Sequence, residues 1–448
     1  MKKALLAAAV AVAAAAGVVV AIVVSSGSEK KPAAPASTGA SSSQPTSGDT
    51  NSGCAPTTTA ATTTTPNATD PVDTSALRLP PPPGRNSARR RTLVVGVVDD
   101  ALAQQTRSFA QAQVDISHGA GFDAAIVSAT WKRGQRRPPR SLVHALGNVA
   151  AAAKKDDMRL FVVVWHGLAR ETPRTPSDRA DFAEYCAALV KTLPTVRDVI
   201  VGNEPNLNTF WAPQFGAGGR DLAAVGYLDL LARSYDAIKA ADPGVRVLGG
   251  ALAPRGADRP GGSRPTHSPT AFIRDLGTAY RASGRKRPLM DAFAFHPYMQ
   301  ASRVPPTASH PTNTSITVAD YPKLVALLEE AFKGTAQPSG RLPIYYTEFG
   351  VQTNVPRTKL RSYSDPGFAG RSDSVGFDVQ AAYYRSALAL AYCQPTVRGI
   401  FIFHTFDEAD FAGWQSGLYF ADGTPKPSLP TFKRAVADLR NGRLVSCR

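Results

Sequence analysis

Two glutamates, Glu204 and Glu348, stand in settings that suit acid–base or nucleophilic chemistry. Glu204 lies in Val-Ile-Val-Gly-Asn-Glu-Pro-Asn, where an apolar β-branched run is broken by Gly202 and Pro205. Glu348 lies in Leu-Pro-Ile-Tyr-Tyr-Thr-Glu-Phe-Gly, an apolar run of the same design. A carboxylate at the C-terminal end of a buried parallel strand is where a barrel enzyme keeps its chemistry. Two such carboxylates are the minimum equipment for cleaving a glycosidic bond.

From residue 92 onward the sequence alternates strand and helix patterns, which predicts an α/β fold, a (β/α)8 TIM barrel. The predicted strands cover residues 93–98, 124–127, 159–164, 196–201, 245–248, 292–295, 342–346 and 397–403. The predicted helices cover residues 108–116, 142–153, 178–193, 222–241, 272–283, 323–332, 375–391 and 427–439. Glu204 then ends the fourth strand and Glu348 ends the seventh, both on the catalytic face of the barrel.

The first 91 residues have a different character. Residues 1–24 are Met-Lys-Lys and an apolar run, long enough at about 1.5 Å per residue to span ~30 Å of hydrocarbon. We expect an apolar helix there that acts as an uncleaved signal anchor, in preference to a cleaved signal peptide. Either one places the rest of the chain outside the cytoplasm, on the cell membrane or secreted. Residues 25–91 are rich in Ser, Thr and Pro, which predicts a disordered linker to the catalytic domain, 92–448.

Composition limits the partners. The chain has 448 residues and a formal net charge of +16, which favours anionic polymers or membranes, although solubility is the simpler interpretation. The sequence shows no nucleic-acid motif, so no nucleic-acid partner is expected. The spacing of His and Cys suggests no metal site, and there is no Gly-rich phosphate loop, so no cofactor is expected. We expect a monomer.

Four cysteines occur in a chain expected to enter an oxidising compartment. Cys393 ends the helix before the eighth strand and Cys447 follows the last helix, so both are expected at the bottom of the barrel. We therefore predict a Cys393–Cys447 disulfide. Cys54 in the linker and Cys186 on a helix are left unpaired.

The motifs together resemble those of clan A retaining glycoside hydrolases, in particular family 39-like and cellulase-like TIM-barrel glycosidases. The resemblance rests on Asn203-Glu204-Pro205, on the Thr-Glu-Phe-Gly around Glu348, and on the His-Pro-Tyr at 296–298 between them. The segment 417–428, Gly-Leu-Tyr-Phe-Ala-Asp-Gly-Thr-Pro-Lys-Pro-Ser, looks like the last barrel loop of these enzymes. The likeness covers roughly residues 93–439, and its motifs are specific together and weak apart.

The resemblance implies a retaining mechanism. Glu204 matches the general acid/base and Glu348 the nucleophile, a pair held ~5–5.5 Å apart in retaining enzymes. Asn203 matches the residue that hydrogen-bonds the sugar 2-hydroxyl. Tyr298 matches a tyrosine that orients the nucleophile, and His296 is expected beside it. A carbohydrate substrate follows.

Other strand ends carry further candidates. Trp131 and Trp414 are candidate subsite walls, because aromatic faces stack on sugar rings; packing under loops is the alternative. His166 is either a sugar contact or a core histidine. Asp99 is a candidate sugar contact, with a structural role as the alternative.

Two positions depart from the family pattern. Clan A enzymes commonly carry a Trp at the end of strand 8 as the floor of the catalytic subsite, where this chain has Phe-His-Thr-Phe at 403–406. An Arg is usual near the end of strand 2, where Lys132 and Arg133 are only approximate matches. The substrate sugar is therefore left open.

The leading hypothesis is an extracytoplasmic retaining hydrolase of a β-linked saccharide. One alternative is a catalytically inactive barrel that binds glycan at the cell envelope, although a binding module needs neither glutamate. Another is a transglycosylase, which would use the same residues.

Overall fold

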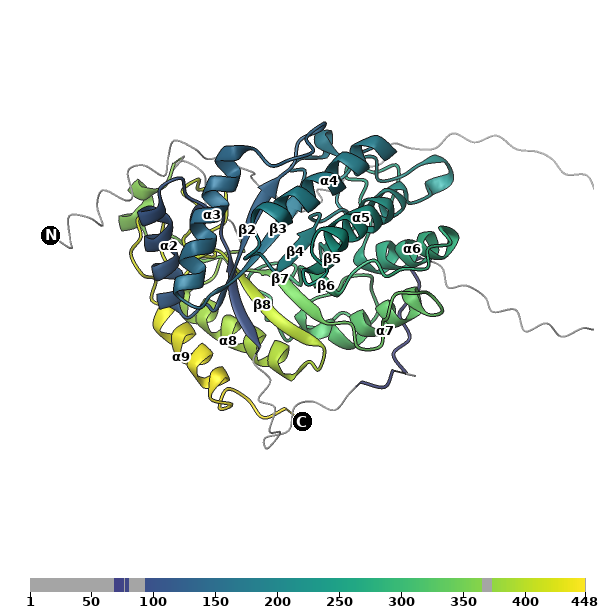
Figure 1. Ribbon diagram of the computed structural model, residues 1–448. Coiled ribbons are helices and arrows are strands. Elements are labelled where there is room, and N and C mark those ends of the chain that lie inside the picture. The colour runs from purple at the N-terminus through teal and green to yellow at the C-terminus, as the bar shows by residue number, and fades with distance from the viewer. Residues whose placement is uncertain (1–67, 76, 80–92, 365–372, 448) are drawn as a thin grey trace, which may run out of the picture.

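The computed structural model describes residues 68–75, 77–79, 93–364 and 373–447. Within them, eight parallel strands close into a barrel in chain order, with the last strand beside the first, and helices surround the barrel (Figure 1). The strands are β1 (Val94–Val98), β2 (Ala124–Thr130), β3 (Arg159–Trp165), β4 (Asp198–Val201), β5 (Arg246–Leu252), β6 (Ala292–Phe295), β7 (Ile344–Phe349) and β8 (Val397–Phe403). The helices are α2 (Arg107–Ala120), α3 (Arg140–Lys155), α4 (Pro176–Thr192), α5 (Leu222–Ala241), α6 (Pro269–Ala282), α7 (Tyr321–Phe332), α8 (Phe377–Cys393) and α9 (Leu429–Arg440). The predicted TIM barrel is confirmed.

The inside of the barrel is a packed core. Inward side chains of β3, β7 and β8 meet there: the Phe161 ring lies 5.5 Å from that of Tyr345 and 5.0 Å from that of Phe401, between centroids. Gly96 on β1 makes room for this contact, because a Cβ atom at that position would lie 2.3 Å from the Phe401 ring. A tightly filled barrel holds the eight strand ends in fixed relative positions.

The N-terminal end of the barrel is closed by charged groups. Asp198 at the start of β4 is fully buried, and its carboxylate accepts hydrogen bonds from Arg159 (2.6 Å) and pairs with Arg246 (3.0 Å). Arg246 also donates to the Tyr345 hydroxyl at 2.7 Å. The buried carboxylate is thus paired on both sides, as a charge removed from water requires.

Two strands, β4 and β7, start two residues later than the sequence predicts. The Val196 N–H still donates to the Leu193 carbonyl in a turn, so β4 starts at residue 198 instead of 196. Leu342 is likewise held in a turn by Ser339, and Pro343 has no N–H, so β7 starts at residue 344. Both differences lie at the end of the barrel opposite the glutamates.

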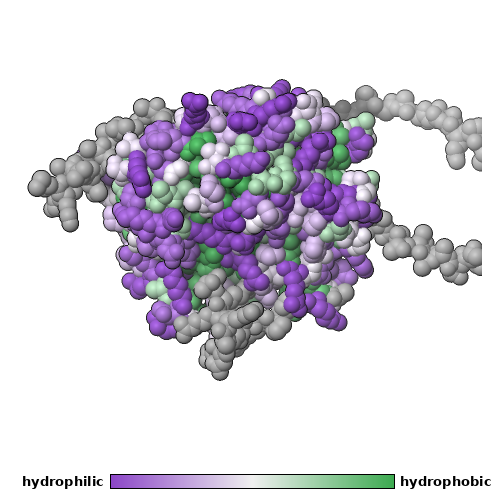
Figure 2. All heavy atoms as spheres, in the orientation of Figure 1, coloured by the Kyte–Doolittle hydropathy of each residue, from purple (hydrophilic) through white to green (hydrophobic). Residues whose placement is uncertain are grey.

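The surface turned to the viewer is mainly hydrophilic, with small apolar areas between polar side chains (Figure 2). The apolar side chains of the helices pack instead against the outside of the strands, where they form the largest buried cluster of the described residues. Burial between two layers is the main stabilisation expected for such a fold.

The N-terminal segment is described in part. The apolar run at 4–24, the predicted anchor, lies outside the described residues. Among the residues that are described, no helix combines the length and apolarity needed to cross a membrane. Part of the predicted linker packs on the barrel: Arg274 of α6 donates to the carbonyl of Asp70 at 2.6 Å, and Val72 is buried. The prediction of disorder throughout 25–91 is wrong for this stretch, because a buried arginine binds its backbone.

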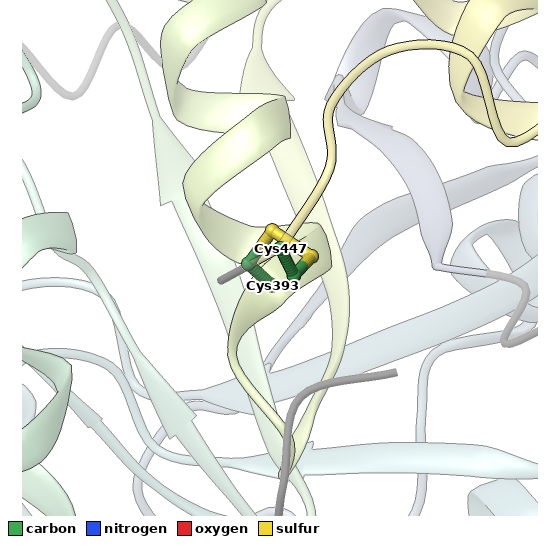
Figure 3. The surroundings of a disulfide bond; sticks show 2 residues. All are labelled: Cys393 and Cys447. Carbon is green, nitrogen blue, oxygen red and sulfur yellow. A yellow bond between two sulfur atoms is a disulfide. The ribbon is translucent and has the colours of Figure 1, made fainter. Parts of the chain in front are cut away.

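The predicted disulfide is confirmed. Cys393 ends α8 and Cys447 follows α9, and their sulfur atoms are bonded, with a Cα–Cα distance of 5.3 Å (Figure 3). Cys186 is a free, buried thiol, as expected, whereas Cys54 lies outside the described residues. The bridge ties the C-terminal tail to the helix that precedes β8.

Removing this bridge should destabilise the barrel. The cysteines are 54 residues apart, and closing a loop of that size stabilises a fold by about 4 kcal/mol in the chain-entropy view. We expect Cys393→Ser/Cys447→Ser to lower the free energy of unfolding by roughly that amount in denaturant titrations. Cys186→Ser is the control, and it should keep the sensitivity of the wild type to reductant. A wild type whose stability is the same with and without reductant would contradict this view.

Candidate active site

The end of β4 turns sharply to present Glu204. Gly202 has φ +84° and Glu204 itself has φ +38°, a left-handed conformation that is uncommon for a residue with a side chain. The Glu204 N–H donates to the carbonyl of Ala251, 2.8 Å away, at the end of β5, and Ala251 is also left-handed (φ +48°). Backbone strain of this kind persists where the surroundings hold it, and it clusters at functional sites.

Tyr227 of α5 holds this turn from behind. Its hydroxyl donates to the Val201 carbonyl at 2.8 Å and accepts from the Gly250 N–H at 2.7 Å, joining the ends of β4 and β5. A Cβ atom on Gly202 would lie 2.9 Å from the Tyr227 ring, so this glycine is required both by its φ and by the ring.

The structure brings Glu204, His296 and Glu348 together. His296 Nδ1 lies 3.0 Å from Glu204 Oε1 and 3.5 Å from Glu348 Oε2. One oxygen of each carboxylate and the ring nitrogen all lie within 4.8 Å of one another. Both carboxylates are largely buried, at 8% and 12% side-chain exposure. The two glutamates predicted from separate motifs therefore form one cluster, bridged by a histidine.

Tyr298 supports Glu348. Its hydroxyl donates to Glu348 Oε2 at 3.1 Å, the contact that the sequence resemblance implied. Arg255, in the loop after β5, donates to the backbone carbonyl of Tyr298 at 3.3 Å. Burial lowers the pKa of Arg255, while the charge of Glu204 raises it. The guanidinium thus adds positive charge near the carboxylate pair.

Burial and mutual repulsion set the protonation of the cluster. Burial, then the charge of Glu204, raises the pKa of Glu348 to about 7, although His296 and Tyr298 act to lower it. Burial alone would lower the pKa of His296, but Glu348 and Glu204 outweigh it and raise the pKa. Burial and both glutamates also raise the pKa of Tyr298, so its hydroxyl stays protonated and can donate a hydrogen bond to Glu348. Near neutral pH the cluster can therefore both hold and release a proton.

An aromatic group lines the same end of the barrel. The Trp414 ring lies 5.1 Å from that of Tyr298 and 5.6 Å from that of Phe403, between centroids. The loop that carries Trp414 is fixed by a buried ion pair, in which Lys426 Nζ donates to Asp407 Oδ1 at 2.6 Å. Trp414 thus lies beside Tyr298 and is largely buried, so its role as a subsite wall stays a prediction.

His404 takes the position after β8 where the resemblance led us to look for a Trp. Its Nδ1 lies 2.8 Å from the Val98 carbonyl and its Nε2 lies 3.2 Å from Glu408 Oε1, so both ring nitrogens face acceptors. Burial acts to lower the pKa of His404, but the hydrogen bond to Glu408 and the charges of Asp99 and Glu408 raise it to about 9. A cationic imidazole therefore replaces a neutral indole beside Phe403.

Two of the sequence candidates, Trp131 and His166, are buried among other side chains. Trp131 is fully buried: its indole N–H donates to the Gln135 carbonyl at 2.6 Å, and its ring packs on Phe182 of α4. His166 is also buried, and burial lowers its pKa to about 4. The expectation of a subsite wall at Trp131 and of a sugar contact at His166 is not met, because apolar packing covers strand ends on that side.

Asp99 has a structural role as well. One of its oxygens accepts from the Ala101 N–H at 3.0 Å and the other from the Thr405 N–H at 3.2 Å, so it joins the ends of β1 and β8. The Arg133 guanidinium also has structural partners, since it donates hydrogen bonds to the backbone carbonyls of Arg170 and Thr172. Neighbouring Lys132 is exposed, and Asn203 is half-buried directly before Glu204.

Sequence reasoning missed three contributors: Arg255, Glu408 and Asn206. Asn206 accepts from the Ala253 N–H at 2.9 Å and donates to the His267 carbonyl at 2.9 Å, which clamps the loop after Glu204 onto the loop after β5. The sequence signal for Asn206 was its place two residues after Glu204, in the Asn-Glu-Pro-Asn motif. Arg255 and Glu408 lie in irregular loops, where no periodicity marks them.

The Glu204–His296–Glu348 cluster also has the donor types of a metal site, since two carboxylates and an imidazole are common ligands. The direct contacts between His296 and both carboxylates already account for its geometry through hydrogen bonding and charge.

Comparison with known proteins places the fold. No family model and no curated protein matches the sequence. Solved structures do: GH5_18 from Streptomyces cattleya in complex with GlcNAc has a TM-score of 0.53 at 18% identity, over 80% of this chain and 82% of that one. A GH5-4 broad-specificity endoglucanase from Clostridium longisporum has a TM-score of 0.51 at 15% identity, over 79% of this chain and 97% of that one. This chain thus shares the TIM-barrel fold of glycoside hydrolases, and the family 39-like assignment is not confirmed.

Glu348 should make the fold less stable as pH rises. The folded state raises the pKa of this carboxyl from the usual 4.5 to about 7, so it binds a proton more tightly than the unfolded chain does. The free energy of unfolding is therefore higher at low pH and falls as the pH rises from about 4.5 to about 7. We expect Glu348→Gln to unfold less readily than the wild type at pH 8, by about 1–3 kcal/mol, and the difference to shrink by pH 5. Denaturant titrations at several pH values would measure it.

The matched control is Glu329→Gln, which removes one carboxylate from the outer helix α7. A difference between Glu348→Gln and the wild type that stays constant from pH 5 to pH 8 would show that Glu348 titrates normally in the fold.

Proposed function

We propose that this protein is a retaining glycoside hydrolase that cleaves a β-linked oligo- or polysaccharide. The observation that carries the proposal is the close approach of two buried carboxylates, with one oxygen of each and His296 Nδ1 within 4.8 Å of one another. Retaining enzymes hold their carboxylates ~5–5.5 Å apart, whereas inverting enzymes separate them by ~6.5–9.5 Å to admit a water. The TIM-barrel likeness to glycoside hydrolases is consistent with this chemistry.

Glu348 is the proposed nucleophile. Tyr298 donates its hydroxyl hydrogen to Oε2, which favours the ionised carboxylate. Among the described residues, no hydrogen bond to Oε1 is present, so we assign attack on the anomeric carbon to that oxygen. The attack forms a glycosyl ester and breaks the bond between the anomeric carbon and the leaving oxygen.

Glu204 is the proposed general acid and base. It protonates the leaving oxygen in the first step and then removes a proton from the water that hydrolyses the ester. His296, held 3.0 Å from Glu204 Oε1, keeps the carboxyl oriented through both steps. Asn203, directly before Glu204, is assigned to the sugar 2-hydroxyl, and Trp414 to a sugar ring in the cleft.

Azide rescue separates the two roles. Glu348→Ala should lose at least 10³-fold in kcat/KM on an activated aryl β-glycoside, and azide should restore cleavage with a product of inverted configuration. Glu204→Ala should form the glycosyl-enzyme from the activated substrate, and azide should then give a product of retained configuration. NMR analysis of the products measures both.

Glu329→Ala on α7 is the control for removing a glutamate side chain, and it should keep near wild-type activity. Inversion by the wild type, or near-normal turnover by both active-site variants, would refute the assignment. Added sugar acceptors would reveal a transglycosylase by its products. A wild type that binds saccharides and cleaves none in a broad panel would favour a glycan-binding barrel.

We further propose that the enzyme acts outside the cytoplasm, tethered by its N-terminal segment. The apolar run at 4–24 and the Ser/Thr/Pro-rich stretch that follows it support this location. Cell fractionation should recover the full-length chain in the membrane fraction, with its barrel accessible to added protease. A soluble, shortened chain in the medium would indicate a cleaved signal instead, and a protected barrel would refute the extracytoplasmic location.

A further inference from the structure

A second cluster of metal-ligating side chains lies outside the candidate active site. Asp221, His267 and Asp275 each offer one ligand atom, and these three atoms lie within 4.8 Å of one another. Asp221 is the N-cap of α5, His267 lies just before α6, and Asp275 lies within α6. The two helices pack side by side (Figure 1).

The Asp221 carboxylate is only half satisfied. Its Oδ1 accepts from the Ala224 N–H at 2.7 Å, as an N-cap does. No hydrogen bond within the described part of the chain reaches Oδ2, although the side chain is only 2% exposed. Burial raises the pKa of Asp221 to about 8, which reflects the cost of an unpaired charge at this position. The side-chain atom that the structure places near this oxygen is His267 Nδ1, at 3.3 Å.

The histidine faces this oxygen with a lone pair. His267 Nε2 lies 3.2 Å from the Gln214 carbonyl, which can only accept, so this nitrogen carries the hydrogen. In the neutral ring, Nδ1 is then an acceptor, and it lies 3.3 Å from Asp221 Oδ2. Two acceptors at this distance repel each other unless a proton or a metal cation lies between them. The ring is held in this orientation by Phe215, whose centroid is 4.0 Å away.

The spacing of His267 Nδ1 and Asp221 Oδ2 matches that of two ligands on one ion. Two ligands each ~2.0–2.1 Å from a tetrahedral zinc lie about 3.3–3.4 Å apart, close to the observed 3.3 Å. A backbone carbonyl that binds the second ring nitrogen is the usual support for a metal-bound histidine. Asp275 is half-buried and supplies a second carboxylate. Its burial and the charge of Asp258 raise the pKa of Asp275 to about 6, whereas Arg274 acts to lower it.

We propose that Asp221, His267 and Asp275 form a binding site for a divalent transition-metal ion, with zinc as the best fit. Two carboxylates and one imidazole suit such an ion better than calcium, which prefers oxygen ligands alone. The ion would clamp the end of the β4–α5 loop to the start of α6. Because Glu204 lies in the first of these segments, the ion would stabilise the wall of the active site. The sequence predicted no metal site, since these ligands are too far apart in the chain to form a local motif.

The test is zinc binding by the full chain after it has been stripped with EDTA. Equilibrium dialysis with ZnCl2 and metal analysis should find one zinc per chain, and zinc should raise the melting temperature. Asp275→Asn and His267→Gln should each weaken zinc binding at least tenfold and remove that rise. Asp221→Asn, which keeps the helix cap, should do the same. Asp229→Asn on the same helix, which weakens part-buried ion pairs with Arg179 and Arg233, is the matched control and should bind zinc as the wild type does.

Glu348→Gln distinguishes this site from the carboxylate cluster of the active site, and it should leave zinc binding unchanged. The proposal is overturned if the stripped chain binds no stoichiometric zinc, or if Asp275→Asn binds zinc as tightly as Asp229→Asn. It is also overturned if Glu348→Gln, and not Asp275→Asn, removes the zinc. Tighter binding of calcium than of zinc would refute the assignment to a transition metal.

Discussion

The contact of one imidazole with two buried carboxylates is the interaction around which this structure is organised. His296 lies within 3.5 Å of an oxygen of both Glu204 and Glu348. Two carboxylates this close and this buried repel each other, and the free energy that this costs has to be supplied by the rest of the fold. The raised pKa of Glu348 is a direct consequence. Near neutral pH such a pair of carboxyls can hold one proton between them, at some expense in stability.

The ends of β4 and β5 hold one of these carboxylates, Glu204, in position through strained backbone. Glu204 and Ala251 both adopt left-handed backbone conformations and are joined by a hydrogen bond of 2.8 Å. Tyr227 from α5 holds the turn from outside the barrel, and Asn206 fixes the loop that follows. The proposed metal site would add a third support, further along the same loop. Several independent restraints on one short segment are what a strained, accurately positioned carboxylate requires.

The last loop completes the site in a different way. Its buried Lys426–Asp407 pair lies among hydrogen bonds from Tyr363 and the Gly417 N–H, so that neither charge is isolated. This network places Trp414 against Tyr298, next to a cationic His404. The indole of Trp414 and the imidazole of His404 thus both lie against the Phe403 ring at this end of the barrel.

The sequence by itself determined the barrel, because β-branched runs and amphipathic helices alternate with a regularity that few other folds allow. It also predicted both glutamates from the rule that the C-terminal strand ends share one rim, and the disulfide from two helix ends at the opposite rim. The role of Tyr298 came from the resemblance to clan A enzymes. Only the tertiary structure decided which strand-end side chains lie near the carboxylates. Trp131 and His166 have the right positions along the chain, yet helix and loop packing buries them, whereas Arg255 reaches Tyr298 from an irregular loop. Likewise, Asp221, His267 and Asp275 meet only in the folded chain, because contacts between distant segments depend on how loops pack and leave no periodic pattern in the sequence.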